Sequence, residues 1–172
     1  MTFGRPFSLR SLRRTAIALV LILPFGLASV VHADSAENAP PEVKYRQTLM
    51  EIVGGNMGAI SDILKNRLDL PGHIAVHAGE MADSAQLIGP AFKKNAQTEA
   101  TDAKPEIWED WAKFEAAIAE FEEAARNLQT AAAGKDSSKV LPAMKALGKS
   151  CSGCHKPFRK PKEESFHNKN RK

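Results

Sequence analysis

The amino-acid sequence predicts an all-α protein, folded as an antiparallel four-helix bundle. Four segments repeat apolar residues at alternating spacings of three and four, and no segment shows the two-residue period of a strand. The connections between these segments are short, except for the stretch from about residue 93 to 104. Amphipathic helices joined by short loops lie antiparallel to their neighbours and bury their apolar faces in a shared interior.

The first two helices are predicted from residue 40 to about 69 and from residue 71 to about 92. The first begins with Pro40 and Pro41, a residue type favoured in the first turn of a helix. Its apolar stripe consists of Met50, Val53, Met57, Ile60 and Leu64. The second is expected to end near Pro90. Its stripe consists of Ile74, His77, Met81, Ala85, Ile88 and Phe92.

The third helix is predicted to follow Thr101 and Asp102, which are capping residue types, and to end at Gly134. It has the most regular apolar stripe of the chain, formed by Ile107, Trp111, Phe114, Ile118, Phe121, Ala125 and Leu128. The fourth helix begins at Asp136 or Ser137. Its stripe consists of Val140, Met144, Leu147, Cys151, Cys154 and Phe158, so both cysteines lie on its apolar face.

The first 33 residues have the layout of a secretory signal peptide. Four arginines precede an apolar run from Thr15 to Val31, and a Val-His-Ala sequence at 31–33 provides a small-residue cleavage site. A membrane anchor is the alternative. However, the run contains Pro24 and Gly26 and is shorter than the roughly 20 residues of a membrane span. We therefore expect export to the periplasm, with no stable membrane insertion after cleavage.

Cleavage after Ala33 would leave one helical domain over residues 34–160 and a basic tail over residues 161–172, whose polar composition predicts disorder. The signal segment holds four of the 24 basic residues, so the remaining chain balances its 20 acidic residues. No aromatic residues are interleaved with a basic stripe, and a nucleic-acid-binding surface is therefore not expected.

The only two cysteines of the chain stand three residues apart in the stretch KSCSGCHKPFR, and a histidine follows the second one. Cys151, Cys154 and His155 form C-x-x-C-H, the attachment signal of a c-type haem. Residues three apart share one side of a helix, so both thiols can add to the vinyl groups of one porphyrin. His155 then offers its imidazole to the iron. We expect one covalently bound haem c per chain, in the bundle core.

Three other roles for the cysteines are less well supported. A structural disulfide is compatible with export. A redox-active C-x-x-C pair usually accompanies alternating strands and helices, which this sequence lacks. Half of a zinc site would need a fourth ligand, and His167 in the polar tail is a poor candidate. No nucleophile is paired with a base near the motif, so an enzyme is not expected.

The sequence resembles the cytochrome c′ family, the class II c-type cytochromes, over nearly all of the chain after residue 33. The resemblance rests on KYRQTLM in the first helix, KPEIW at the start of the third, and CSGCH followed by FR. It implies a bundle with the haem motif near the C-terminus and allows a homodimer through the first two helices. By matching position it places Arg46 and Gln47 near the haem propionates and Arg159 beside the histidine. Pro157, however, predicts that the last helix bends or ends at that point.

The resemblance also places Met50 on the open side of the iron, where the family shows two behaviours. In high-spin members an apolar side chain blocks the sixth site, and nitric oxide or carbon monoxide can bind. In low-spin members a methionine sulfur binds the iron and the protein carries electrons. The segment GHIAVHAGEMA in the second helix resembles the low-spin branch.

Residue chemistry also favours Met50 as a ligand. Its long thioether can reach an iron from a neighbouring helix, and a histidine and methionine pair raises the reduction potential. The alternative is that Met50 only fills the interior, as Met57 and Met81 also lie on apolar stripes. We expect a one-electron carrier that meets redox partner proteins transiently, with gas binding as the alternative function.

His77 lies on an apolar stripe and has three interpretations. Such a histidine is most often an interior residue whose polar atoms are satisfied by protein partners. The sharper hypotheses are a hydrogen bond to a haem propionate and ligation of the iron in place of Met50.

Overall fold

A computed structural model describes residues 39–169, except for the side chain of His167. The predicted signal peptide lies outside the described residues. Within them the long helices are α1 (Pro41–Asn66), α2 (His73–Phe92), α4 (Trp111–Ala133) and α5 (Val140–Phe158). The shorter elements are α3 (Glu106–Glu109), α6 (Phe166–Lys169) and the 3-10 turns η2 (Ser137–Lys139) and η3 (Lys162–Glu164). This part of the chain contains no strand, only an isolated bridge between Ala103 and Arg159.

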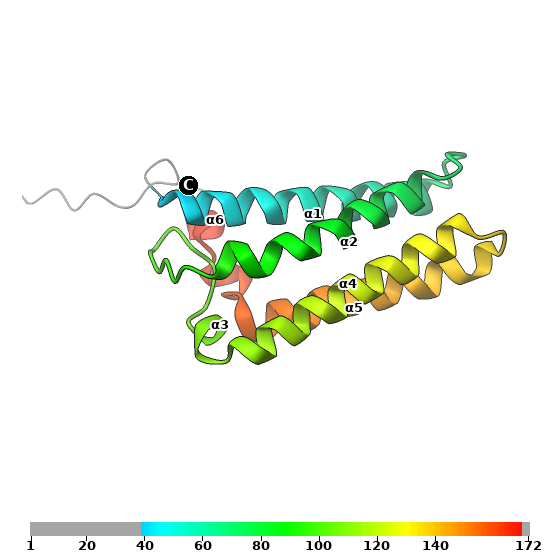
Figure 1. The fold of residues 1–172 in the computed structure, drawn as a ribbon. Helices are drawn as coiled ribbons and strands as arrows, with labels where there is room; N and C mark the ends of the chain where they lie inside the picture. Colours follow the sequence, from blue (N-terminus) through cyan, green and yellow to red (C-terminus); the bar gives the residue numbers. More distant parts are fainter. Residues whose placement is uncertain (1–38, 170–172) are drawn as a thin grey trace, which may run out of the picture. The chain divides into compact units, whose positions relative to one another are not determined.

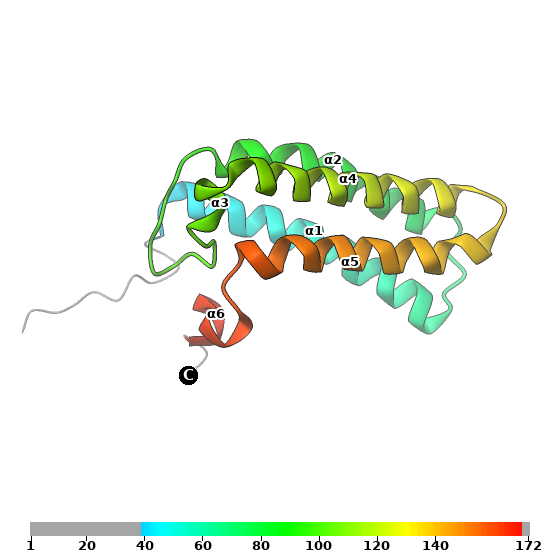
Figure 2. The same cartoon turned by 90° about the horizontal axis from the view of Figure 1, so that it is seen from below.

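Consecutive long helices run antiparallel, with α1 beside α2, α2 beside α4, and α4 beside α5 (Figure 1, Figure 2). The first and last of them, α1 and α5, make few backbone contacts with one another. The prediction of an antiparallel four-helix bundle is confirmed, and its least tightly packed side lies between α1 and α5. None of the helices in residues 39–169 is long and apolar enough to cross a membrane.

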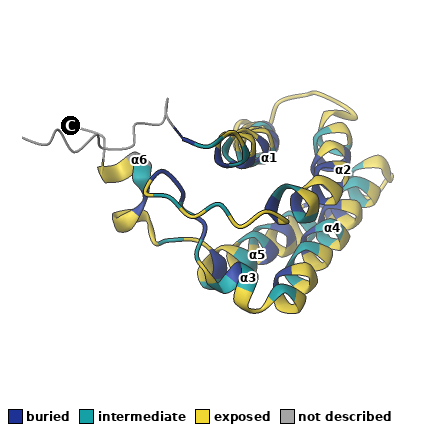
Figure 3. Ribbon diagram, turned by 60° about the vertical axis from the view of Figure 1, so that its left-hand side comes forward, coloured by how far each residue is buried: buried dark blue, intermediate teal, exposed yellow. Residues whose placement is uncertain are grey.

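The apolar stripes of the helices contribute to one core cluster. Figure 3 shows that α1, α2, α4 and α5 all carry buried residues. The most deeply buried large side chains of this cluster include Ile60, Met81, Ile107, Leu128 and Leu147. Each such side chain contributes about 1.5–3 kcal/mol through the surface that it removes from water. By contrast, Met50, Val53 and Met57 of α1 contact this core but stay only partly buried.

The third predicted helix is interrupted at Asp110. This residue leaves helical geometry, with φ −131° and ψ 67°, between α3 and α4. Its carboxylate accepts a hydrogen bond of 3.2 Å from the backbone N–H of Lys113 and so caps α4. The predicted cap Asp102 instead accepts a hydrogen bond of 2.8 Å from the backbone N–H of Phe166. The apolar period continues through the break, which is why the sequence pattern does not reveal it.

Two helices continue past a proline before they end. α2 reaches Phe92 although Pro90 lies in its last turn, and α5 reaches Phe158 although Pro157 does. A proline removes one backbone donor from the helix, so both helices stop within two residues of it. The ends predicted from these prolines are therefore right to within two residues.

Part of the predicted disordered tail is folded in the structure. Residues 162–164 form η3, residues 166–169 form α6, and Ser165 is buried. Phe166 packs against a small cluster formed by Ala39, Val43 and Ala100. The contacts that order this segment come from the loop before α3 and from the start of α1, and composition alone does not reveal them.

Candidate functional site

The C-x-x-C-H motif occupies the last two turns of α5. Cys151 and Cys154 are free, half-buried, and packed against the main core cluster. The two residues between them, Ser152 and Gly153, are exposed. Both thiols therefore lie on the side of α5 that faces the bundle, as the three-residue spacing predicts.

Burial raises the pKa of both thiols. The pKa of Cys154 rises to about 11, with the neighbouring Cys151 adding to the effect. Burial also raises the pKa of Cys151, and a backbone hydrogen bond offsets part of that rise. Redox-active C-x-x-C pairs have a lowered pKa, so this environment argues against a dithiol redox centre. Addition of each thiol across a vinyl group would bond the sulfur to one carbon and place the hydrogen on the other.

The imidazole of His155 lies at the surface of α5, yet nearby protein atoms remove part of its hydration. This desolvation lowers its pKa, and the positive charge of Arg159 lowers it further. The ring is therefore neutral at pH 7, which is the form that binds a metal. The backbone N–H of Arg159 donates to the carbonyl of His155 at 3.0 Å, so the two residues are adjacent at the end of α5.

One contact gives the register between α1 and α5. A Cβ added to Gly148 would lie 3.8 Å from Cε of Met57, so this methionine reaches across to α5. The two helices run antiparallel (Figure 2). Met50 lies seven residues before Met57, and His155 lies seven residues after Gly148. Seven residues are two turns, or about 10 Å, and return to nearly the same helix face, so helix periodicity predicts about the same level for Met50 and His155.

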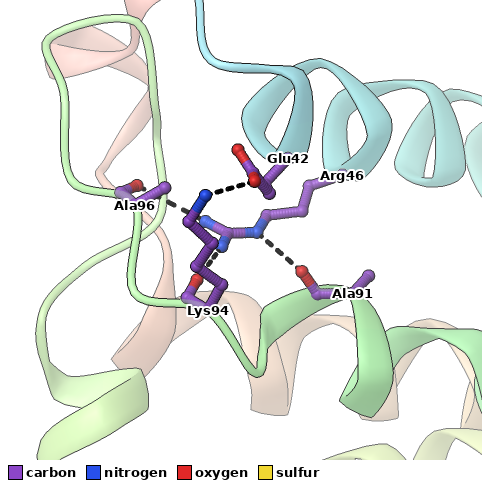
Figure 4. Close-up of polar contacts among 5 residues, drawn as sticks. All are labelled: Glu42, Arg46, Ala91, Lys94 and Ala96. Carbon is purple, nitrogen blue, oxygen red and sulfur yellow. Dashed lines mark hydrogen bonds and ion pairs between the residues drawn. The ribbon is translucent and has the colours of Figure 1, made fainter.

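Arg46 lies one turn before Met50 and is buried, with 3% of its surface exposed. Its guanidinium donates to three backbone carbonyls at and after the end of α2 (Figure 4). Nε donates to Ala91 at 2.9 Å, Nη1 donates to Ala96 at 3.5 Å, and Nη2 donates to Lys94. Burial lowers the pKa of Arg46, but an arginine remains charged at neutral pH.

The guanidinium also lies over two aromatic rings, 4.8 Å from the ring centre of Phe92 and 5.2 Å from that of Trp108. The next residue, Gln47, donates from Nε2 to the carbonyl of Ala100 at 2.9 Å. The structure thus brings Arg46 and Gln47 to the loop between α2 and α3. A contact of either side chain with the haem propionates stays a prediction.

His77 has a protein partner that the sequence does not reveal. Its Nδ1 forms a hydrogen bond of 2.8 Å with Oδ1 of the buried Asn56, which lies on α1. The carboxylate of Glu80 is 3.8 Å from the same nitrogen. His77 is partly buried, and this geometry fits its simplest interpretation, a histidine whose Nδ1 is satisfied by a protein partner.

The residues present fit a covalently attached haem. Two neutral thiols share one side of α5, a neutral imidazole follows the second, and Met50 lies at the same level on the opposite helix. The side of the bundle between α1 and α5 is also the one with the fewest backbone contacts. Among residues 39–169, no group of three or more histidine, cysteine, aspartate or glutamate side chains is arranged to hold a metal ion.

Antiparallel helices with a C-x-x-C-H motif in the last of them define a c-type cytochrome of the four-helix-bundle class. A family model described as Cytochrome C' matches residues 41–159. Cytochrome c' of Rhodospirillum rubrum is 31% identical over 142 residues, which cover 81% of this chain and 97% of that protein. The one from Pararhodospirillum photometricum is 35% identical over 124 residues, covering 70% and 99%. The chain belongs to the cytochrome c′ family.

The fold agrees with solved structures of this family. The nitric oxide complex of a mutant of cytochrome c prime from Alcaligenes xylosoxidans matches with a TM-score of 0.64 at 27% identity. The match covers 76% of this chain and 99% of that one. Proteins of the family carry covalently bound haem c, and so does this protein.

Proposed function

We propose that the protein is a periplasmic one-electron carrier whose iron is held by His155 on one side and by the sulfur of Met50 on the other. The supporting observation is the shared level of these two residues across α1 and α5, which follows from the contact between Met57 and Gly148. Methionine is a flexible, soft ligand, and a histidine and methionine pair raises the reduction potential while closing the iron to small ligands.

When bound, the haem supplies the one-electron couple between ferric and ferrous iron. Cys151 and Cys154 would hold it on α5, and His155 would offer it a neutral imidazole. The positive charge of Arg159 beside His155 opposes the additional positive charge of the ferric state. Arg159 therefore raises the reduction potential, as methionine ligation also does.

The proposed partners are redox proteins that present an acidic surface. Lys156, Arg159 and Lys162 are exposed at the end of α5 and just after it, close to the haem attachment residues. Such charges accelerate transient encounter with an opposite charge, and salt screens them. Replacing Lys156 and Lys162 by glutamate should slow electron transfer to an acidic partner at low salt. If the unmodified protein transferred electrons at the same rate at low and high salt, this role would be contradicted.

Two further proposals concern assembly and export. Tyr45 and Ile52 on α1, with Val76 and Leu87 on α2, are large apolar side chains that are 47–60% exposed. They support a homodimer through these two helices, which sedimentation would detect.

Export by the signal peptide predicts that the protein purified from the periplasm begins at Asp34, and an intact residue 1 there would contradict cleavage.

Carbon monoxide binding tests the electron-carrier proposal. With Met50 on the iron, the absorption spectrum of the ferrous holoprotein should respond little to carbon monoxide. A rapid and complete spectral change would show an open sixth site and contradict the proposal.

A second candidate function is the binding of nitric oxide or carbon monoxide. The observation that favours it is the solved nitric oxide complex of the Alcaligenes xylosoxidans relative. On this candidate Met50 fills space beside an open site, as other interior methionines do. The iron would then be high-spin in both oxidation states, and carbon monoxide would bind at once to the ferrous form.

A further inference from the structure

We propose that the loop between α2 and α3, residues 93–105, is a strap that fixes the distance between Met50 and His155, with Arg46 and Gln47 as the positioning residues on α1. The strap is hydrogen-bonded both to α1 and to the end of α5, two helices that make few backbone contacts with each other, and both attachments lie within one turn of a candidate iron ligand in sequence. The part of this inference that concerns Met50 as a ligand rests on the proposed function.

One end of the strap is attached to α1. Arg46 donates to the carbonyls of Lys94 and Ala96 within the strap (Figure 4). Gln47 donates to the carbonyl of Ala100. The ammonium of Lys94 in turn pairs with Glu42, one turn before Arg46. Residues three and four apart are neighbours on a helix, so Arg46 and Gln47 adjoin Met50 directly. The attachment therefore restrains the turn of α1 that carries Met50.

The other end of the strap is attached to the chain at the end of α5. The backbone N–H of Lys104 donates to the carbonyl of Phe158 at 3.0 Å, and that of Lys160 donates to Asp102 at 2.8 Å. Nζ of Lys160 also donates to the carbonyl of Thr101 at 2.7 Å. Phe158 lies three residues after His155, so this attachment restrains the turn that carries the histidine.

The strap matters because α1 and α5 make few backbone contacts with each other. The contact between Met57 and Gly148 lies two turns away from Met50 and His155. A carbonyl can turn toward water once its donor is removed, so a weakened strap should let α1 move away from α5. A methionine ligand would then leave the iron more often.

The test uses the holoprotein with one variant at each end of the strap. Gln47→Ala removes a hydrogen bond on α1, and Lys160→Met removes one after α5 while keeping the apolar stem. Gln86→Ala on α2 and Lys145→Met on α5 are matched controls at exposed positions outside the strap. Two readouts are measured: the fraction of ferric iron that is high-spin, and the rate of amide hydrogen exchange in residues 46–50.

Loss of one intramolecular hydrogen bond changes an equilibrium by about fivefold. We expect each strap variant to raise the ratio of high-spin to low-spin iron by about that factor and to accelerate exchange in this turn of α1. The effect of the double variant on the spin ratio and on exchange should be smaller than the sum of the effects of the two single variants, because both substitutions release the same strap. Exchange rates and spin ratios equal to those of the two controls would overturn the proposal.

The same variants separate failure of the strap from failure of the electron-carrier proposal. If the unmodified protein is fully high-spin, Met50 is not a ligand, and the rate of carbon monoxide binding replaces the spin ratio as the readout. If the strap restrains α1, carbon monoxide should bind faster to Gln47→Ala and Lys160→Met than to the unmodified protein, since the side chain at position 50 moves aside more easily. Rates equal to those of the controls would overturn the strap in that case too.

Discussion

Met57 on α1 ends close to Gly148 on α5, within van der Waals reach of a Cβ at that position, and two turns further along both helices are Met50 and His155. The geometry predicts that a methyl group fits at this contact, because a Cβ at position 148 would sit 3.8 Å from Cε of Met57. Gly148→Ala should therefore stabilise the protein by about 0.5–1 kcal/mol, the cost of a glycine within a helix. Denaturant unfolding of the holoprotein measures this change. Gly148→Phe is the matched overpacking variant and should destabilise by about 1–3 kcal/mol; equal stability of both variants would contradict the contact.

Replacement of Arg46 should be among the most damaging substitutions outside the core. Arg46→Ala leaves three carbonyls without their donor, and hydrogen bonds to a charged group contribute about 1.5–3 kcal/mol each. We expect a loss of at least about 3 kcal/mol in the free energy of unfolding, with a smaller loss for Arg46→Lys, which lacks the planar fork. Urea unfolding of both variants provides the measurement.

Arg126→Ala is the control for this experiment. Arg126 on α4 is an exposed arginine that pairs with Glu122 one turn away, at 2.9 Å. Exposed pairs of this kind contribute less than about 1 kcal/mol. If Arg46→Ala lowered the free energy of unfolding no more than Arg126→Ala does, the proposal that Arg46 holds the loop would be wrong.

His77→Phe should leave the ferric iron low-spin if Met50 is the ligand, because the substitution then removes no iron ligand, only the hydrogen bond between His77 Nδ1 and Asn56. Its main effect should be on stability, since the buried amide of Asn56 loses its partner at a cost of about 1–3 kcal/mol. The double variant with Asn56→Leu should recover part of this loss. Absorption spectroscopy and thermal unfolding check the two effects separately. Conversion of His77→Phe to high-spin iron would instead identify His77 as the sixth ligand.

The ion pair between Glu42 and Lys94 predicts a contribution to stability that depends on pH. The hydrogen bond from Lys94 is the main reason that the pKa of Glu42 lies below its ordinary value of 4.5. A carboxyl group whose pKa falls on folding stabilises the protein above its unfolded pKa, and this contribution disappears as pH falls through the folded pKa. Glu42→Gln should thus lower the denaturation midpoint slightly at pH 7 and by less at pH 3, below the ordinary pKa of 4.5. A difference of the same size at both pH values would rule out the ion pair as its cause.

The helices and the haem attachment residues could be predicted from the sequence because they depend on local pattern. The apolar stripes follow the helical period, and the C-x-x-C-H motif needs only five consecutive residues. The register between Met57 and Gly148 could not be predicted, since it depends on how two helices distant in sequence pack together.

The contacts of Arg46, Gln47 and Lys160 were beyond prediction for a different reason. All three donate to backbone carbonyls, which every residue possesses, so the accepting positions have no sequence signature. Asn56 is similar, because its partner His77 is 21 residues away on another helix. Asp110 interrupts a stripe whose period continues on both sides of it, so only the structure reveals the cap.

The most direct test of Met50 as an iron ligand compares the ferric absorption spectra of the unmodified holoprotein and of Met50→Leu. Leucine fills a similar volume but has no sulfur to bind the iron. We predict a low-spin spectrum with a weak sulfur-to-iron charge-transfer band in the unmodified protein, and loss of both features in Met50→Leu. A high-spin spectrum that is the same in both proteins would contradict ligation by Met50 and leave the binding of nitric oxide or carbon monoxide as the better account of the function.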